Sequence, residues 1–233
     1  RLKRYGLARA DAERSQLGVS SSKSMGEEED WERFWLEKNG PLLRLGRNWF
    51  NRLLIWPIIL GNLSRGGTVL ELGCGCASIY PFLKDYAGQY VGIDTSRIAV
   101  AAARKELAKH GKGNCGILLE DLATFRTEAK FDLVFSQGVI EHFDDYCWVA
   151  RKHQEFVKNG GKAVVFFPVK KGPFEWWYAL SMAVPALNAT WPWGEQGFVD
   201  YEKDLRNGLI DLTHTYSEHF GIGVLVIEKN MLQ

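Results

Sequence analysis

An apolar run that breaks into a glycine turn constrains the fold of this chain more than any other feature. Residues 69–72 form a β-type run, and the turn Gly73-Cys74-Gly75 follows directly. A second apolar run ends in a single acid, Asp94, 19 residues after Gly75. Glycine permits positive φ and a close approach of ligand to backbone. An acid at the carboxyl end of the neighbouring strand can accept two hydrogen bonds from a ribose diol, so the two features predict a nucleoside-containing cofactor.

A nicotinamide dinucleotide would suit the same spacing, and the residues around the turn separate the two cofactor classes. The dinucleotide fingerprint Gly-x-Gly-x-x-Gly has its third glycine where this chain has Ser78. Glu71 stands at the end of the first strand, where its charge would repel a pyrophosphate but would tolerate a cationic sulfonium ligand with an α-amino group. No Tyr-x-x-x-Lys pair follows the fourth predicted strand. A nicotinamide-dependent oxidoreductase is therefore the less favoured alternative.

The chain resembles the class I S-adenosylmethionine-dependent methyltransferases, whose first motif is an acid followed by Gly-x-Gly-x-Gly or Ala. Glu71, Gly73, Gly75 and Ala77 match that motif in order. Within that class it most resembles the small, metal-independent members called type 11 or type 12. The resemblance covers residues 68–168. It implies an α/β fold with a Rossmann-like parallel sheet flanked by helices and a C-terminal antiparallel hairpin. It also implies S-adenosylmethionine as the cofactor and S-adenosylhomocysteine as the product.

The same resemblance assigns expected roles to residues at the strand ends. Asp121, next to Leu122, is implied to contact the adenine amino group, and the backbone near Ser136 and Gln137 to border the methionine part of the cofactor. The complete predicted cofactor set is Glu71, Gly73, Cys74, Gly75, Asp94, Asp121, Leu122, Ser136 and Gln137.

His142 is the candidate catalytic residue, because it follows the fourth predicted strand near the expected methyl acceptor. A histidine titrates near neutral pH and can take a proton from a hydroxyl or an amine. The alternative is a structural role, in which His142 caps the next helix or orders the loop. The neighbouring Glu141 is interpreted as a solvated or pocket-rim acid. Asp144 and Asp145 are interpreted as helix-capping residues, and no metal site is predicted.

The chain divides by composition into a tail and one domain. Residues 1–26 are predicted to be a flexible N-terminal tail, and residues 27–233 a single methyltransferase domain. Within that domain, residues 27–64 form an N-terminal helical cap and residues 169–210 an aromatic-rich insertion over the ligand edge of the sheet. Four tryptophans of the cap and the insertion are candidate acceptor-binding residues, with packing inside the domain as the alternative: Trp31, Trp35, Trp177 and Trp193.

Charge and composition exclude some classes of partner. The chain has 29 basic and 28 acidic residues, so it lacks the basic excess that duplex nucleic acid requires. No apolar run approaches the roughly 20 residues of a membrane span, although shallow interfacial contact would suit a lipid-like acceptor. The sequence predicts a cytoplasmic enzyme, EC 2.1.1.-, that methylates an apolar or aromatic small molecule on O, N or C. An inactive cofactor-binding partner subunit is the second alternative.

Overall fold

The computed structural model describes the backbone of most of the chain. The described residues are 28–37, 41–110, 113–170, 172, 175–176, 179–180, 183 and 198–230, with the side chains of 28–31, 37 and 41–44 left aside. The helical elements are α1 (Glu28–Glu37), α2 (Pro41–Phe50), η2 (Asn51–Ile55), α3 (Trp56–Asn62), α4 (Tyr80–Leu83), α5 (Arg97–Ala108), η3 (Ile140–His142), α6 (Tyr146–Phe156), η4 (Tyr201–Leu205) and η5 (Asn207–Leu209). The strands are β1 (Thr68–Leu72), β2 (Gln89–Asp94), β3 (Cys115–Leu119), β4 (Phe131–Gln137), β5 (Val157–Pro168), β6 (His214–His219) and β7 (Ile222–Glu228).

The strands form one seven-stranded sheet in the order β3-β2-β1-β4-β5-β7-β6. Strands β1 to β5 pair in parallel, whereas β7 pairs antiparallel with both β5 and β6. The predicted parallel α/β sheet with a C-terminal antiparallel hairpin is therefore confirmed. The strand order reverses between β1 and β4, and open α/β sheets bind ligands at the carboxyl ends of the strands beside such a reversal.

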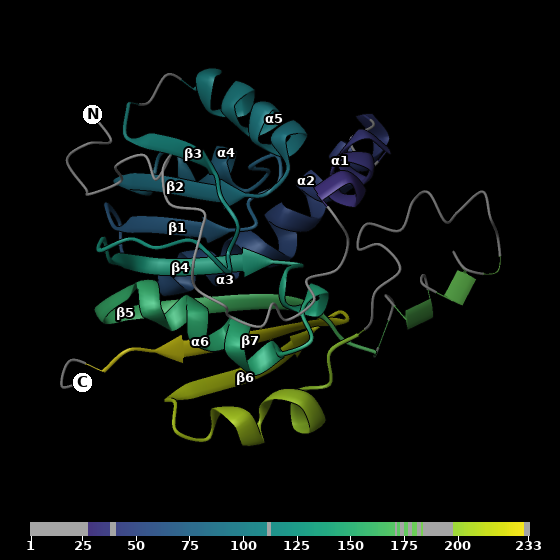
Figure 1. Ribbon diagram of the computed structural model, residues 1–233, viewed down its shortest axis with the longest axis vertical. Helices are drawn as coiled ribbons and strands as arrows, with labels where there is room; N and C mark the ends of the chain where they lie inside the picture. The colour runs from purple at the N-terminus through teal and green to yellow at the C-terminus, as the bar shows by residue number, and fades with distance from the viewer. Residues whose placement is uncertain are drawn as a thin grey trace, which may run out of the picture.

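Helices cover both faces of the sheet (Figure 1). On one face α3, α4 and α5 pack through Ile59, Leu83 and Ala103 among other buried side chains. On the other face α6 and η4 pack through Val149 and Leu205. This division buries apolar side chains on both faces of the central strands, as parallel sheets require.

Capping side chains define where two of the long helices begin. The Ser96 hydroxyl accepts a hydrogen bond from the backbone N–H of Ala99 at the start of α5. The Asp145 carboxylate accepts one from the backbone N–H of Trp148 at the start of α6, at 2.8 Å. The capping interpretation of Asp145 is thus confirmed, and α6 begins without help from His142.

The sequence pattern predicts a turn at Ser136-Gln137-Gly138, a helix stop at 159–161 and a first hairpin strand at residues 211–216. The structure differs in these three places. The expected turn at Ser136 and Gln137 is wrong, because both residues continue β4. The expected helix stop at 159–161 lies inside β5, where Gly160 has a φ of +77° and donates its N–H to the carbonyl of Lys229. Backbone pairing thus keeps these residues in the strand. The first hairpin strand runs three residues later than expected, at His214–His219.

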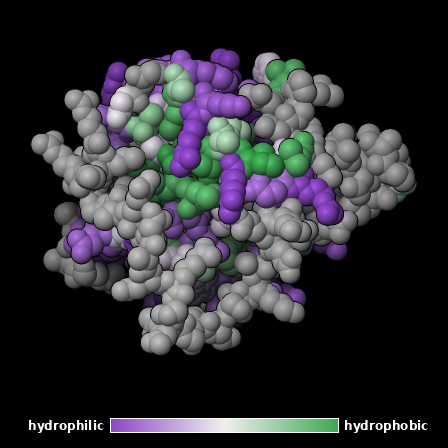
Figure 2. Space-filling model, turned by 45° about the horizontal axis from the view of Figure 1, so that its top comes forward, coloured by the Kyte–Doolittle hydropathy of each residue, from purple (hydrophilic) through white to green (hydrophobic). Residues whose placement is uncertain are grey.

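Apolar side chains also reach the surface of the described residues. Figure 2 shows one face on which hydrophobic side chains gather between hydrophilic ones. No helix among the described residues has both the length and the apolar character that crossing a membrane requires. The division of the domain at residues 27–64 and 169–210 stays a prediction, and the expected tail lies outside the described residues.

Candidate cofactor and acceptor site

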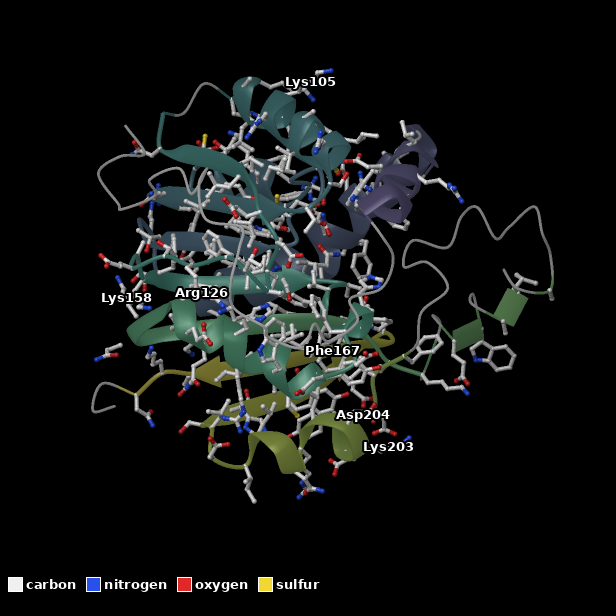
Figure 3. The ribbon with its side chains drawn as sticks, viewed as in Figure 1. Lys105, Arg126, Lys158, Phe167, Lys203 and Asp204 are labelled. Atoms are coloured by element: carbon white, nitrogen blue, oxygen red, sulfur yellow. The ribbon has the colours of Figure 1, made fainter. Side chains whose placement is uncertain are left out.

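The carboxyl ends of the parallel strands meet at one edge of the sheet. Figure 3 shows Lys158 and Phe167 toward opposite ends of β5, and Phe167 marks the carboxyl end. Beside it β4 ends at Gln137, and the glycine turn follows β1 directly. Helices α1 and α2 lie at the same edge in Figure 1. The strand order thus places the predicted site where the helical cap meets the sheet.

The glycine turn after β1 has no room for side chains. Gly73 and Gly75 have φ values of +66° and +51°. A Cβ on Gly73 would come within 2.5 Å of the Val139 side chain, and one on Gly75 within 2.4 Å of the Trp35 ring. Both the backbone conformation and the packing therefore require glycine, which leaves the turn's backbone open to close contacts.

Asp94 joins the end of β2 to the glycine turn. Its Oδ2 accepts a hydrogen bond from the backbone N–H of Gly75 at 2.7 Å, and its Oδ1 accepts one from the backbone N–H of Ser96 at 2.9 Å. Burial raises the pKa of Asp94, and the two backbone N–H groups oppose that rise. Each carboxylate oxygen keeps a second lone pair, so both can still accept hydrogen bonds from a diol.

Glu71 is buried under the same turn and has a partner that sequence reasoning missed. The Tyr90 hydroxyl of β2 donates a hydrogen bond to Glu71 Oε2. Burial raises the pKa of Glu71 to about 8 against the opposing effect of Tyr90, so the carboxyl carries a proton at neutral pH. The strand register explains this contact. Tyr90 pairs with Val69 and Glu71 pairs with Gly92, so the side chains of Tyr90 and Glu71 lie on the same face of the sheet. A cation bound nearby would lower this pKa and release the proton.

Ser136 faces away from the predicted site. His153 on α6 donates from Nδ1 to the carbonyl of Val149 at 2.7 Å, because a carbonyl can only accept. Its Nε2 must therefore accept the hydroxyl proton of Ser136, at 2.8 Å. Both residues are fully buried. Only the backbone of Ser136 is left for a cofactor, and the side-chain pair fastens β4 to α6.

The buried His153 gives the fold a specific sensitivity to acid. Burial lowers its pKa from 6.5 to about 4, so the unfolded chain binds the proton first as the pH falls. The contribution of His153 to the free energy of unfolding is fully present above about pH 6.5. As the pH falls from 6.5 to 4, the protein loses about 3 kcal/mol of that free energy. In urea unfolding, the difference in free energy between the natural protein and His153→Asn should shrink by this amount from pH 7 to pH 4. A difference that stays constant with pH would contradict the assignment.

Glu141 and His142 are buried in η3, directly after β4. Their exposed fractions are 4% and 9%, so the interpretation of Glu141 as a solvated or rim acid is wrong. Neither carboxylate oxygen of Glu141 has a hydrogen-bond partner among the residues that the structure describes, and burial raises the pKa of Glu141 to about 8. A buried polar group without a partner is costly, which is a reason to look for a ligand at that position.

Helix α1 lies against the glycine turn and α5. Glu32 accepts hydrogen bonds from the Ser96 hydroxyl and from the backbone N–H groups of Arg97 and Ile98, at 3.1, 2.6 and 3.1 Å. One turn later, the Trp35 ring contacts Gly75. Arg47 of α2 lies over the same ring, with its guanidinium carbon 5.8 Å from the ring centroid. The sequence indicated Trp35 but not Glu32 or Arg47, whose partners are far away along the chain.

The remaining predicted residues lie in three different settings. Asp121 is exposed and accepts a hydrogen bond from the backbone N–H of Ala123, whereas Leu122 belongs to the hydrophobic core. Cys74 is buried with its sulfur against Gly92, so only its backbone faces the turn. The side chain of Trp31 and all of Trp177 and Trp193 lie outside the described residues.

A family model described as a methyltransferase domain matches residues 63–189, more than half of the chain. The chain belongs to the methyltransferase domain family. Its sheet has the class I, S-adenosylmethionine-dependent methyltransferase fold. The predicted resemblance to the class I S-adenosylmethionine-dependent methyltransferases is thereby confirmed.

Two relatives and one solved structure show how far the likeness extends. The methyltransferase is 33% identical to (S)-coclaurine N-methyltransferase of Papaver somniferum over 41% of this chain and 28% of that protein. It is 31% identical to a ubiquinone biosynthesis O-methyltransferase of Nitrosomonas europaea over 52% of each chain. Magnesium protoporphyrin IX methyltransferase of Synechocystis shares the fold with a TM-score of 0.59 and 17% identity, over 87% of this chain and 94% of that one. The methyltransferase thus spans between about a quarter and half of the length of these curated relatives.

S-adenosylmethionine is the cofactor of this family, and the residues of the methyltransferase fit it. The glycine turn presents backbone without Cβ atoms at Gly73 and Gly75, next to the side chains of Val139 and Trp35. Asp94 keeps acceptors free at the end of β2, and Glu71 supplies a carboxyl for a cationic ligand. The Asp94 carboxylate would be unfavourable toward a pyrophosphate, because like charges repel.

Proposed function

We propose that the protein transfers a methyl group from S-adenosylmethionine to a small apolar or aromatic acceptor. The observation that carries this proposal is the hydrogen bond between Asp94 and Gly75, which joins an acid at the end of β2 to the glycine turn after β1. Asp94 would hold the ribose diol, and the backbone of Gly73, Cys74 and Gly75 would lie against the cofactor. Glu71 would release its proton when the cationic methionine part binds, and the resulting carboxylate would pair with that cation.

The other cofactor contacts follow the same edge of the sheet. Asp121 and Leu122, after β3, would border the adenine. The backbone of Ser136 and Gln137, at the end of β4, would border the methionine part. Trp35 would close the site from the cap, in agreement with its contact to Gly75. The roles of Asp121, Leu122, Ser136 and Gln137 are supported by position, since these residues lie at or just after the carboxyl ends of parallel strands.

Bound S-adenosylmethionine supplies an electrophilic methyl group that needs no further activation. The chain must therefore position the acceptor and exclude water, which can lower the barrier by about 7–11 kcal/mol. A hydroxyl or ammonium acceptor must also lose a proton. His142 and the neighbouring Glu141 would take that proton, because both are buried directly after β4 and the Glu141 carboxylate has no other partner.

Apolar side chains near the ends of β4 and β5 support an apolar or aromatic acceptor. The residues that meet there leave no space for a water molecule between them: Phe50, Ile55, Gln137, Gly138, Phe166, Phe167 and Ile222. Close by, the ring of Phe167 stacks on Tyr216, which stacks on Tyr201. The names of the relatives include both an N- and an O-methyltransferase, and either acceptor atom fits a site that offers proton acceptors.

Calorimetry with the full chain tests the cofactor class. We expect S-adenosylhomocysteine to bind with at least micromolar affinity, whereas NAD and NADP give no signal. Binding of S-adenosylmethionine should release protons, since its sulfonium and α-ammonium charges lower the raised pKa of Glu71. Titrations in two buffers of different ionisation enthalpy measure that release. A signal with NAD in the absence of one with S-adenosylhomocysteine would overturn the proposal.

A further inference from the structure

The helical segment from α2 through η2 to α3 is apolar on two opposite sides. One side is buried against the sheet through Ile55 and Ile59. On the other side four large apolar side chains face solvent, with exposed fractions of 56, 58, 62 and 38%: Leu45, Trp49, Leu53 and Leu60. We call these four residues the apolar stripe. Their spacing of four, four and seven residues keeps them on one side of a helix.

A surface helix ordinarily turns a polar side to water, because exposed apolar area gains nothing from folding. The apolar stripe departs from this pattern over its full length, from α2 to α3. A single exposed leucine needs no explanation, whereas a contiguous row of leucine and tryptophan is typical of a surface that contacts another phase or molecule.

The charges along the sequence of this segment all have one sign. No acidic residue lies between Glu37 and Glu71, whereas the same stretch contains five basic ones: Lys38, Arg44, Arg47, Arg52 and Arg65. Arg52, beside Leu53, and Arg65, just after α3, are exposed to solvent. Basic residues beside a row of leucine and tryptophan are typical of helices that lie in the interface of a bilayer. The attraction requires anionic lipid headgroups.

We propose that the apolar stripe docks this protein on an anionic lipid surface. Trp49 and Leu53, in the middle of the stripe, enter the boundary between headgroups and acyl chains. Arg52 and Arg65 contact the headgroup phosphates. A second copy of the chain is a poorer occupant, because self-association of the stripe would bring two sets of arginines together with no acid between Glu37 and Glu71 to pair with them.

The docked orientation would bring the lipid surface close to the strand ends. The helical segment that carries the stripe also contributes Phe50 and Ile55 to the side chains that meet there, beside Gln137 of β4. One continuous helical segment therefore joins the proposed lipid contact to the carboxyl edge of the sheet. The lipid contact itself depends only on the outer surface of the segment, so it can be tested independently of methyl transfer.

Sedimentation with lipid vesicles tests the docking. The full chain is mixed with vesicles of phosphatidylglycerol and phosphatidylcholine, and separately with vesicles of phosphatidylcholine alone. We expect partition into the anionic vesicles, and a loss of about tenfold or more for Trp49→Glu and Leu53→Glu. Arg52→Glu should weaken partition, whereas Arg52→Lys should preserve it. Ile210→Glu is the matched control, because Ile210 is 84% exposed and follows η5, on the opposite face of the sheet.

Circular dichroism and cofactor calorimetry on each variant show that the fold is retained, and more than half of each substituted stripe side chain is already in water. The proposal is overturned if the natural protein stays in the supernatant with anionic vesicles, or if Leu53→Glu partitions as the natural protein does. It is also overturned if light scattering shows a dimer that Leu53→Glu converts to a monomer, since a second copy would then cover the stripe.

Discussion

Replacing Asp94 by alanine is expected to weaken S-adenosylhomocysteine binding by about a hundredfold or more. The carboxylate would lose two charge-assisted hydrogen bonds to the ribose, each worth about 1.5–3 kcal/mol, and every 1.4 kcal/mol is a factor of ten in affinity. The glycine turn would also lose its support, because Asp94 accepts the N–H of Gly75 at 2.7 Å. Calorimetry on the purified variant measures the change directly.

Asp94→Asn is the matched control for this experiment. The amide keeps the size of the side chain and one oxygen acceptor, but it loses the charge and cannot accept from both Gly75 and Ser96. We expect its affinity to lie between those of the natural protein and Asp94→Ala. Both variants should unfold cooperatively, because a half-buried acid at a strand end adds little to the core. A folded Asp94→Ala protein with unchanged affinity would show that the ribose is held elsewhere.

Replacing Glu141 by glutamine is expected to lower kcat by about 10²–10⁴, the usual contribution of a positioned proton acceptor. The carboxyl is buried without a partner and burial raises its pKa to about 8, so it is a strong base once it has lost its proton. Activity of the natural protein should therefore rise with pH through about 8. A panel of small phenols and secondary amines, scored by release of S-adenosylhomocysteine, provides the assay.

The glutamine variant should lose that rise with pH, while its affinity for S-adenosylhomocysteine stays unchanged. His142→Gln, at the adjacent buried position, distinguishes the two candidate bases. If the rise through pH 8 survives in His142→Gln and is absent in Glu141→Gln, the carboxyl accepts the proton. Full activity of Glu141→Gln on an acceptor that the natural protein methylates would mean that Glu141 is structural.

Sequence patterns were sufficient for the framework of the site. The residues 69–75 and Asp94 belong to one β-turn-helix-β unit, so their proximity follows from local connectivity and from the parallel pairing of β1 with β2. The hairpin was predicted, but its first strand was placed at residues 211–216, three residues before the observed strand His214–His219. Gly160 was read as a helix stop, and only its pairing with Lys229 keeps it in β5.

The cap and the buried polar groups could not be predicted in the same way. Glu32 and Ser96 are 64 positions apart in sequence, and no periodicity reports such a contact. The sequence shows that Glu141 precedes His142. Whether the Glu141 side chain is exposed to solvent or buried depends on how η3 packs against β5 and α6. The same holds for His153, whose tautomer follows from its neighbours Val149 and Ser136.

The sequence by itself determined the class of fold, the glycine turn and the position of Asp94, because these depend on backbone conformation and on contacts within one local unit. The tertiary structure alone decided that Tyr90 donates to Glu71, that Trp35 contacts Gly75 and that Glu141 is buried without a partner. Desolvation and long-range hydrogen bonding depend on which surfaces meet, and that information exists only once the chain has packed.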